Sequence, residues 1–383
     1  MKHHAQGQDA PELRKLERIR PMDAVMALYS EGEEELTEAI VASLSHAVFH
    51  EGHPGPAGPA QRALARISYQ ILKWTTTTRR TTSEGYQGGA FHNPILEWSR
   101  HPYGRALLDS SSRETESLVE GGDPMNGPYM MIAPEILKGS DIWDRLFLQS
   151  VQSRDVQLRF IWETRATYET ARSYLEKNGQ VLLKAVAAGT GLSMILAYNR
   201  LIEEGHDPAR ITVRITDRDK ANIAKTGRLL AKLPSTKSNV TEDESKAGIS
   251  AGTEDLFAGT HGGDTSGGAT YHIITAVGIL EYLQGFTCAT TEQNHGVQQP
   301  DEPVLAEHLA AKLGRMTRGA GHLIVNTYRP HASARILELF GRKFDYRNQE
   351  NLTALLATAD FGTPRLVGSG NMFDVIVYEK KPS

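Results

Sequence analysis

The stretch VLLKAVAAGTGLSM, residues 181–194, places an apolar run directly before Gly189-Thr190-Gly191 and the start of a helix-like segment. A strand that enters a helix through a Gly-x-Gly turn lets a ligand approach the backbone closely. This is because glycine has no side chain and the first N–H groups of a helix lack partners within it. The stretch therefore predicts an α/β fold that binds a nucleotide-type ligand over the turn.

Short β-rich runs alternate with helical segments from about residue 179 onward. The intervening lengths suit crossover helices, and the candidates for parallel strands are 181–186, 211–215, 246–251, 271–276 and 322–327. A helix expected over 352–362 is followed by PRLVGS and FDVIVYE, which flank a turn at 368–371 and predict a hairpin on the sheet edge. Residues 179–383 are thus expected to form a seven-stranded, mostly parallel sheet with helices on both faces.

The first 149 residues lack strand alternation and offer helical segments broken by Gly and Pro. Residues 22–49 and 62–74 carry apolar side chains at three- and four-residue spacing, so we expect an all-α N-terminal cap domain in which these two faces pack on each other. The run TTTTRRTT at 75–82 is expected to be a loop or linker. A long helix over 150–178 is expected to connect the two domains and act as a lid.

Composition excludes several classes of partner. A net charge of -4 gives no general attraction to nucleic acid or anionic membranes, so we expect a small-molecule substrate. No apolar stretch approaches the roughly 20 residues needed to cross a bilayer, which predicts a cytoplasmic protein. Cys288 is the only cysteine, and His261 and His295 are isolated, so we expect no disulfide and no metal site.

The turn itself favours one type of ligand over another. A dinucleotide-binding turn would read G-x-G-x-x-G, but the third glycine position is occupied by Met194, which disfavours NAD. S-adenosylmethionine needs only the close turn and an acidic residue at the end of the next strand to hold the ribose hydroxyls. Asp217 in ITDRD stands at that place, and Asp219 is expected to begin the following helix.

Five motifs in order resemble those of class I S-adenosylmethionine-dependent methyltransferases: AAGTG, ITDRD, GTEDLF, YHIITAVGILEYL and RGAGHLIVNTY. The resemblance covers about residue 179 to the C-terminus. It implies a Rossmann-like methyltransferase sheet and S-adenosylmethionine as the cosubstrate. The residues that it implies for cofactor binding are Gly189, Thr190, Gly191, Asp217, Arg218, Glu254, Asp255, Ala276, Val277 and Gly278. Glu254 or Asp255 would accept from the adenine amine, although either is equally explained as an ordinary acid at a helix N-terminus.

Four further residues are assigned from their places beside these motifs. Arg165 and Tyr168, one turn apart on the 150–178 helix, are expected to meet the cofactor carboxylate. Glu281 and Tyr282 follow the fourth strand, where such enzymes often place substrate-facing groups, and are expected to be the catalytic residues.

The sequence departs from the methyltransferase pattern at the first motif. Members usually carry a carboxylate where this chain has Ala185 and a glycine where it has Ala187. The cofactor ammonium must therefore be held differently, or its amino group is left free. His272 stands where the family commonly has Asp and is expected to be structural.

Three functions remain open at this stage. The leading hypothesis is methyl transfer to a small acceptor by in-line displacement at the sulfonium, beneath a roof formed by the N-terminal helices. An alternative is aminocarboxypropyl transfer, or cyclisation of the cofactor's own amino acid to azetidine-2-carboxylate, with methylthioadenosine as the spent nucleoside. The third is a methyltransferase-like interaction module without catalysis. The sequence does not specify an oligomeric state.

Overall fold

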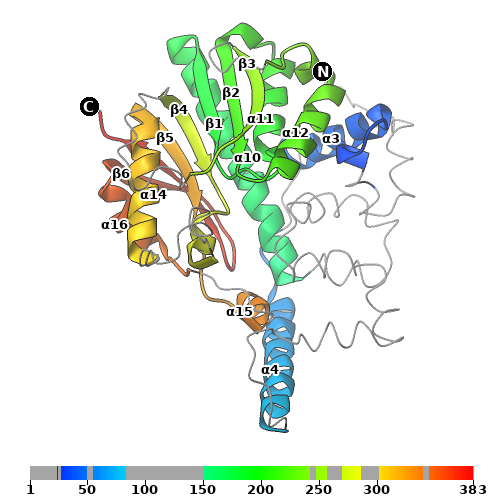
Figure 1. The fold of residues 1–383 in the computed structure, drawn as a ribbon, viewed down its shortest axis with the longest axis vertical. Coiled ribbons are helices and arrows are strands. Elements are labelled where there is room, and N and C mark those ends of the chain that lie inside the picture. Colours follow the sequence, from blue (N-terminus) through cyan, green and yellow to red (C-terminus); the bar gives the residue numbers. More distant parts are fainter. Residues whose placement is uncertain are drawn as a thin grey trace, which may run out of the picture.

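The computed structural model describes residues 24, 27–49, 55–82, 150–241, 247–256, 270–285, 302–339 and 345–382. These residues form one sheet flanked by helices, with a long helix projecting away from it (Figure 1). Two polar insertions are expected from the sequence at 259–269 and 291–303. The first and most of the second lie outside the described residues, with Cys288, His261 and His295, while residues 302–303 begin a helix.

The sheet has seven strands in the order β3-β2-β1-β4-β5-β7-β6. Their bounds are β1 (Val181–Ala185), β2 (Ile211–Asp217), β3 (Gly248–Thr253), β4 (Tyr271–Ala276), β5 (Thr317–Asn326), β6 (Phe361–Ser369) and β7 (Asp374–Lys380). β1 to β5 are mutually parallel along this order, and β7 runs antiparallel to both β5 and β6. The prediction of a Rossmann-like methyltransferase sheet that ends in an edge hairpin is confirmed.

Each face of the sheet carries its own hydrophobic core, because alternate side chains of a strand point to opposite faces. On one face, Leu183 and Val213 pack with α3 (Glu34–Phe49), α10 (Val151–Asn178), α11 (Leu192–Glu203) and α12 (Lys220–Lys232). On the other, Ile274 and Leu323 pack with α14 (Glu302–Met316) and α16 (Gln349–Ala357). The remaining helical elements are α4 (Pro59–Thr82), α13 (Pro234–Lys237), α15 (Ala332–Leu339), η2 (Pro208–Arg210) and η3 (Leu280–Gly285).

Helix α10 matches the predicted connecting helix almost residue for residue. Ser150 is its N-cap and accepts the Ser153 N–H at 3.2 Å, while Gly179 ends it in the left-handed region with φ of 72°. The chain then enters β1 directly. The C-terminal half of α10 therefore lies beside the edge where the parallel strands begin, and its N-terminal half lies toward the edge where they end.

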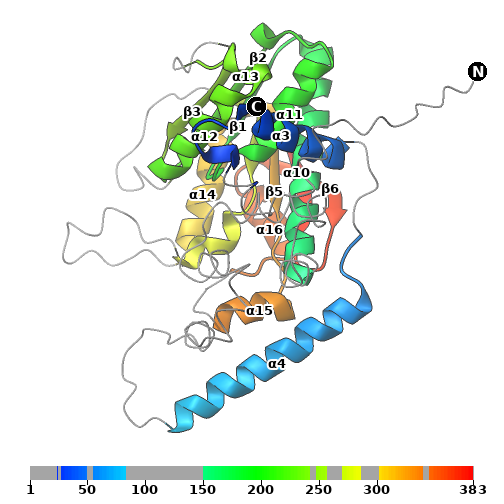
Figure 2. The same cartoon turned by 90° about the vertical axis from the view of Figure 1, so that its right-hand side faces the viewer.

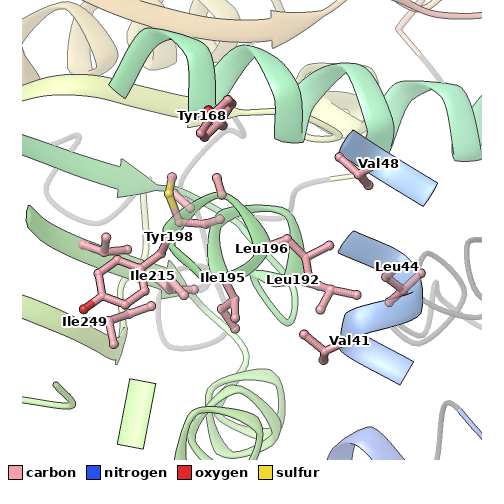
Figure 3. Packing of buried hydrophobic residues seen from close by; sticks show 14 of the residues in the cluster. Val41, Leu44, Val48, Tyr168, Leu192, Ile195, Leu196, Tyr198, Ile215 and Ile249 are labelled. Carbon is pink, nitrogen blue, oxygen red and sulfur yellow. The ribbon is translucent and has the colours of Figure 1, made fainter. Parts of the chain in front are cut away.

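The two N-terminal helices have different partners. Val41, Leu44 and Val48 of α3 lie against Leu192 and Leu196 of α11, so α3 belongs to the core of the sheet domain (Figure 3). Helix α4 lies instead along α15, well away from α3 (Figure 2). The prediction that these two helical faces pack on each other is wrong for the described residues. An apolar stripe specifies the face that is buried but not the element that covers it.

The prediction of a loop or linker at 75–82 is also wrong, because these residues continue α4 to Thr82. No glycine or proline interrupts the helix before that point. The lower helix propensity of threonine costs only a few tenths of a kcal/mol per residue, which is too little to end a helix that has already begun. Whether residues 1–149 form a domain of their own stays a prediction, since 83–149 lie outside the described part.

The packing of α3 predicts the effect of two matched substitutions. Leu44 is 4% exposed and Leu64 on α4 is 59% exposed. Leu44→Ala should lower the free energy of unfolding by about 2–5 kcal/mol, because it leaves a cavity against α11. Leu64→Ala should change it by no more than about 0.5 kcal/mol. Urea denaturation of both variants measures the difference, and similar effects would contradict the placement of α3.

Candidate functional site

The glycine turn is a tight backbone loop between β1 and α11. Gly189 and Gly191 have φ of 57° and 64°, in the left-handed region that glycine adopts without steric cost. A Cβ at Gly191 would come within 2.5 Å of Ile215 on β2, so this glycine also permits close packing of the helix N-terminus on the sheet. The Ala188 N–H donates to the Thr216 carbonyl at 3.0 Å, which fixes the turn beside the end of β2.

Ala185 and Ala187 stand where the methyltransferase pattern usually has a carboxylate and a glycine, and the two replacements have different structural effects. Ala187 has φ of 48°, so it occupies the strained conformation in which a glycine would be comfortable. Where the methyltransferase pattern usually has glycine, this chain thus has an alanine in the left-handed region. The Ala185 side chain is buried, and its methyl group cannot replace the missing carboxylate.

Asp217 connects the turn to the end of β2. Its Oδ2 accepts the Gly189 N–H at 2.8 Å, and its Oδ1 accepts the Asp219 N–H at 2.8 Å and the Asn222 amide at 3.3 Å. A carboxylate offers about four acceptor positions, so one remains for a ligand. Among the described residues, the buried Oδ1 of Asn222 has no hydrogen-bond partner. This corner therefore offers acceptors to a ligand that donates through hydroxyl groups.

Thr190 faces the N-terminal segment and not the open edge of the sheet. Its hydroxyl accepts from the Tyr29 hydroxyl at 2.9 Å, and its side chain is buried. Arg228 and Lys232 of α12 donate to the carbonyls of Tyr29 and Ala27 at 2.6 and 2.7 Å. Residues 27–30 are consequently held to the glycine turn through Thr190 and to α12 through Arg228 and Lys232.

The end of β4 forms a second part of the same edge. Gly278, with φ of 82°, donates its N–H to Asn326 at the end of β5 at 2.7 Å. Glu281 is 2% exposed, and its Oε1 lies 2.9 Å from Nη1 of Arg159 on α10. Burial raises the pKa of Glu281, although the Arg159 charge opposes this. Ala276 is buried and Val277 is half-buried, so they offer mainly backbone groups to this edge.

The catalytic assignments stay predictions. The carboxylate of Glu281 forms an ion pair with Arg159 and lies 3.4 Å from the Asn326 amide nitrogen. These contacts position the Arg159 guanidinium at the end of β4. The backbone of Tyr282 lies in η3, but its side chain is outside the described part of the chain.

Glu163 is a candidate site residue that the sequence did not indicate. It lies one turn after Arg159 on α10, and its Oε1 accepts the hydroxyl of Ser193, in the first turn of α11, at 2.8 Å. The side chain is half-buried, and surrounding protein raises its pKa from the ordinary 4.5 to about 7. Ser193 lowers it, and so does the nearby charge of Arg159. No ion pair to Glu163 within 4.0 Å is found among the described residues.

Arg165 and Tyr168 lie further along α10, toward the opposite edge of the sheet. Arg165 Nε donates to the Val48 carbonyl of α3, and the Tyr168 hydroxyl donates to Glu204 at 2.6 Å. Their role as cofactor ligands stays a prediction, and both side chains are already engaged by other partners. The direction of the helix was the available signal, because residues nearer its N-terminus lie nearer the carboxyl ends of the strands.

The loop after β3 contains the candidates for adenine recognition. Glu254 forms an ion pair with Lys184 of β1 at 2.7 Å, and its N–H donates to the Asp217 carbonyl at 3.0 Å. The carbonyl of Asp255 accepts from Lys312 at 3.3 Å, and Arg218 is exposed nearby at the end of β2. The structure thus brings this loop beside Asp217, as the motif order predicts, while adenine binding itself stays a prediction.

A hollow of about 340 Å³ lies at the other edge of the sheet, where the parallel strands begin. Tyr174 and His322 line it, and the Tyr174 hydroxyl donates to the Ala320 carbonyl. Near this edge His272 accepts the Leu182 N–H at 2.9 Å, which supports its expected structural role. In open α/β sheets ligands bind at the carboxyl ends of strands, so this hollow is not the candidate site.

Over the described ranges, no three His, Cys, Asp or Glu side chains gather in a way that could hold a metal ion. None of the helices there is both long and apolar enough to cross a membrane.

Comparison with known proteins finds similarity only among solved structures, because no protein-family model and no curated protein matches. A possible exported protein from Bordetella parapertussis aligns over 90% of this chain and 96% of its own, at 13% identity and a TM-score of 0.46. The CMeT domain of the citrinin polyketide synthase aligns over 95% and 98%, at 12% and 0.45. The CurJ carbon methyltransferase aligns over 98% and 97%, at 14% and 0.42.

The raised pKa of Glu163 predicts a pH-dependent cost of folding. A carboxyl whose pKa is about 7 in the folded state and 4.5 when unfolded binds more protons when folded, so its contribution to stability falls as the pH rises from about 4.5 through 7. Glu163→Gln removes this cost. Urea denaturation should therefore show the variant gaining stability relative to the natural chain between pH 5 and pH 8. An unchanged difference would contradict the assignment.

Proposed function

We propose that the chain is an S-adenosylmethionine-dependent transferase that methylates a small molecule. The observation that carries the proposal is the link between Asp217 and the Gly189 N–H at the carboxyl edge of the sheet. This link joins the glycine turn to an acceptor-rich corner at the end of the next strand. The methyltransferase-like motif order and strand order support the same assignment.

The residues of this edge fit the nucleoside part of the cosubstrate. The remaining acceptor position of Asp217 and the unpartnered Oδ1 of Asn222 suit a pair of ribose hydroxyls. Gly189 and Gly278 allow the ligand to approach the backbone at the ends of β1 and β4. S-adenosylmethionine, when bound, supplies an electrophilic sulfonium methyl group, so the protein has mainly to position the acceptor and exclude water.

A small acceptor is favoured by the charge of the chain and by its N-terminal segment. Residues 27–30 are held to the glycine turn by Thr190 and to α12 by Arg228 and Lys232, so they reduce access to the turn from that side. We expect the N-terminal region to select the acceptor and to exclude bulky ones.

A second candidate follows from Ala185. Without the usual strand-end carboxylate, the amino group of the cosubstrate lacks its ordinary partner, as cyclisation requires: the amine attacks Cγ, the Cγ–S bond breaks and methylthioadenosine leaves. In aminocarboxypropyl transfer an acceptor attacks the same carbon and the same bond breaks. These reactions release methylthioadenosine, whereas methyl transfer releases S-adenosylhomocysteine. Mass spectrometry of the spent nucleoside separates them.

Binding to Asp217 can be tested with a matched pair of variants. Asp217→Ala should weaken S-adenosylmethionine binding by about 1.5–3 kcal/mol, because a hydrogen bond to a charged group is lost. Asp219→Ala is the control, since its carboxylate is exposed and caps α12 through the Ala221 N–H at 2.8 Å. Calorimetry measures both, with thermal unfolding to check that each variant folds. Equal affinity of Asp217→Ala and the natural chain would contradict the proposed site, and so would absence of binding by the natural chain.

A further inference from the structure

We propose that Glu163 and Arg159 of α10 form a clamp for the amino-acid end of S-adenosylmethionine, in which Glu163 replaces the carboxylate that is absent at Ala185. The clamp rests on the proposed function and goes beyond it by assigning the ammonium and the carboxylate of the cosubstrate to named side chains.

No cation forms an ion pair with the Glu163 carboxylate among the described residues. It is half-buried against the first turn of α11, and Ser193 supplies its one described side-chain hydrogen bond, to Oε1. Taking a carboxylate out of water costs free energy unless a cation or several donors compensate. Arg159 is close enough to influence Glu163 electrostatically, but no ion pair joins the two among the described residues. An arriving ammonium group would supply the missing compensation.

The Arg159 guanidinium has N–H donors beyond the one that contacts Glu281. Its Nη1 contacts Glu281 at 2.9 Å, and its guanidinium lies 4.6 Å from the centre of the Phe373 ring. Both Nη atoms would lie 3.5 Å from a Cβ placed at Gly278, so the group sits over the end of β4. A guanidinium has five N–H donors, and the ion pair with Glu281 leaves others for a ligand carboxylate.

Arg159 and Glu163 lie at the carboxyl edge of the sheet, where ligands bind in open α/β folds. Arg159 lies over the end of β4 and Glu163 over the start of α11, which follows β1. Crossovers from β1 and β4 leave in opposite directions along the strand order, so the space between their carboxyl ends is the switch point where α/β sheets bind ligands. Residues four apart on a helix are neighbours, about 5–6 Å between Cβ atoms. A cation and an anion at this spacing match a group that carries its ammonium and carboxylate on one carbon atom.

The test uses ligands that separate the two charges. Calorimetry compares S-adenosylhomocysteine, its analogue without the α-amino group, its analogue without the carboxyl group, and methylthioadenosine, which lacks the whole amino-acid end. Glu163→Gln should lower affinity by about 10- to 100-fold for the two ligands that carry the amino group and leave the other two unchanged. Arg159→Gln should do the same for the two ligands that carry the carboxyl group.

Glu176→Gln is the matched control, because this glutamate lies on the same helix but is exposed and paired with Arg172 at 2.9 Å. It should change no affinity. Glu163→Gln can keep the hydrogen bond with Ser193 and removes a poorly compensated charge, so it is expected to fold. Arg159→Gln leaves Glu281 without its cation, and should that variant unfold, the Glu163→Gln series decides alone.

The outcomes distinguish the clamp from the proposed function. Equal losses for all four ligands in Glu163→Gln would show a structural effect and overturn the clamp, as would unchanged affinities. In both cases nucleoside binding by the natural chain would leave the proposed function standing. If the natural chain binds none of the four, both proposals are overturned.

Discussion

The structure depends on how helix α10 compensates acidic groups, both its own and those of its neighbours, at the carboxyl edge of the sheet. Burying a carboxylate is costly unless donors or a cation replace water. Asp155 accepts the Met372 N–H and the Asn371 amide from the β6–β7 turn, so it ties the helix to the edge hairpin. One turn later, Arg159 compensates Glu281 and ties the helix to η3. Glu163 lies a further turn along, and Ser193 is the only side-chain donor to it among the described residues.

These contacts explain why α10 is more than a connection between two regions. Its apolar residues cover one face of the sheet, while its polar residues reach the edge hairpin, the end of β4 and the start of α11. Further along, Arg165 and Tyr168 hold α3 and the end of α11. The same helix therefore supports the core and faces the proposed binding edge, and its Glu163 lies where a ligand is expected.

Much of the sheet domain could be predicted because its signals are local. The apolar runs, the Gly-Thr-Gly turn and the sequence between Pro364 and Glu379 each specify a strand, a turn or a hairpin from neighbouring residues. Ser150 and Gly179 likewise specify both ends of α10. The element on which a helix packs is not specified by neighbouring residues in the sequence. The stripes of α3 and α4 showed which faces are apolar, but α3 packs on α11 and α4 on α15.

In the candidate site too, some residues could be predicted from their neighbours in the sequence, and others depend on how the helices pack. Asp217 follows directly from its place after a strand, and the structure puts it against the glycine turn. Glu163 could not be chosen over Arg165 from spacing alone, because both lie on a long helix whose polar residues all resemble solvated ones. The direction of α10 favours the residue nearer its N-terminus, and the placement of α10 beside α11 then brings Glu163 to Ser193. Ala187 has a conformation that its residue type does not predict, because its φ of 48° lies in the left-handed region that favours glycine.

The central claim is that the carboxyl edge between β1 and β4 binds a nucleoside with an amino-acid tail. A crystal structure with S-adenosylhomocysteine tests this most directly. The account predicts the ribose at Asp217, the thioether over Gly189 and the amino-acid end between Arg159 and Glu163. Density for the nucleoside in the hollow beside Tyr174 and His322, or with its amino-acid end turned away from α10, would contradict it.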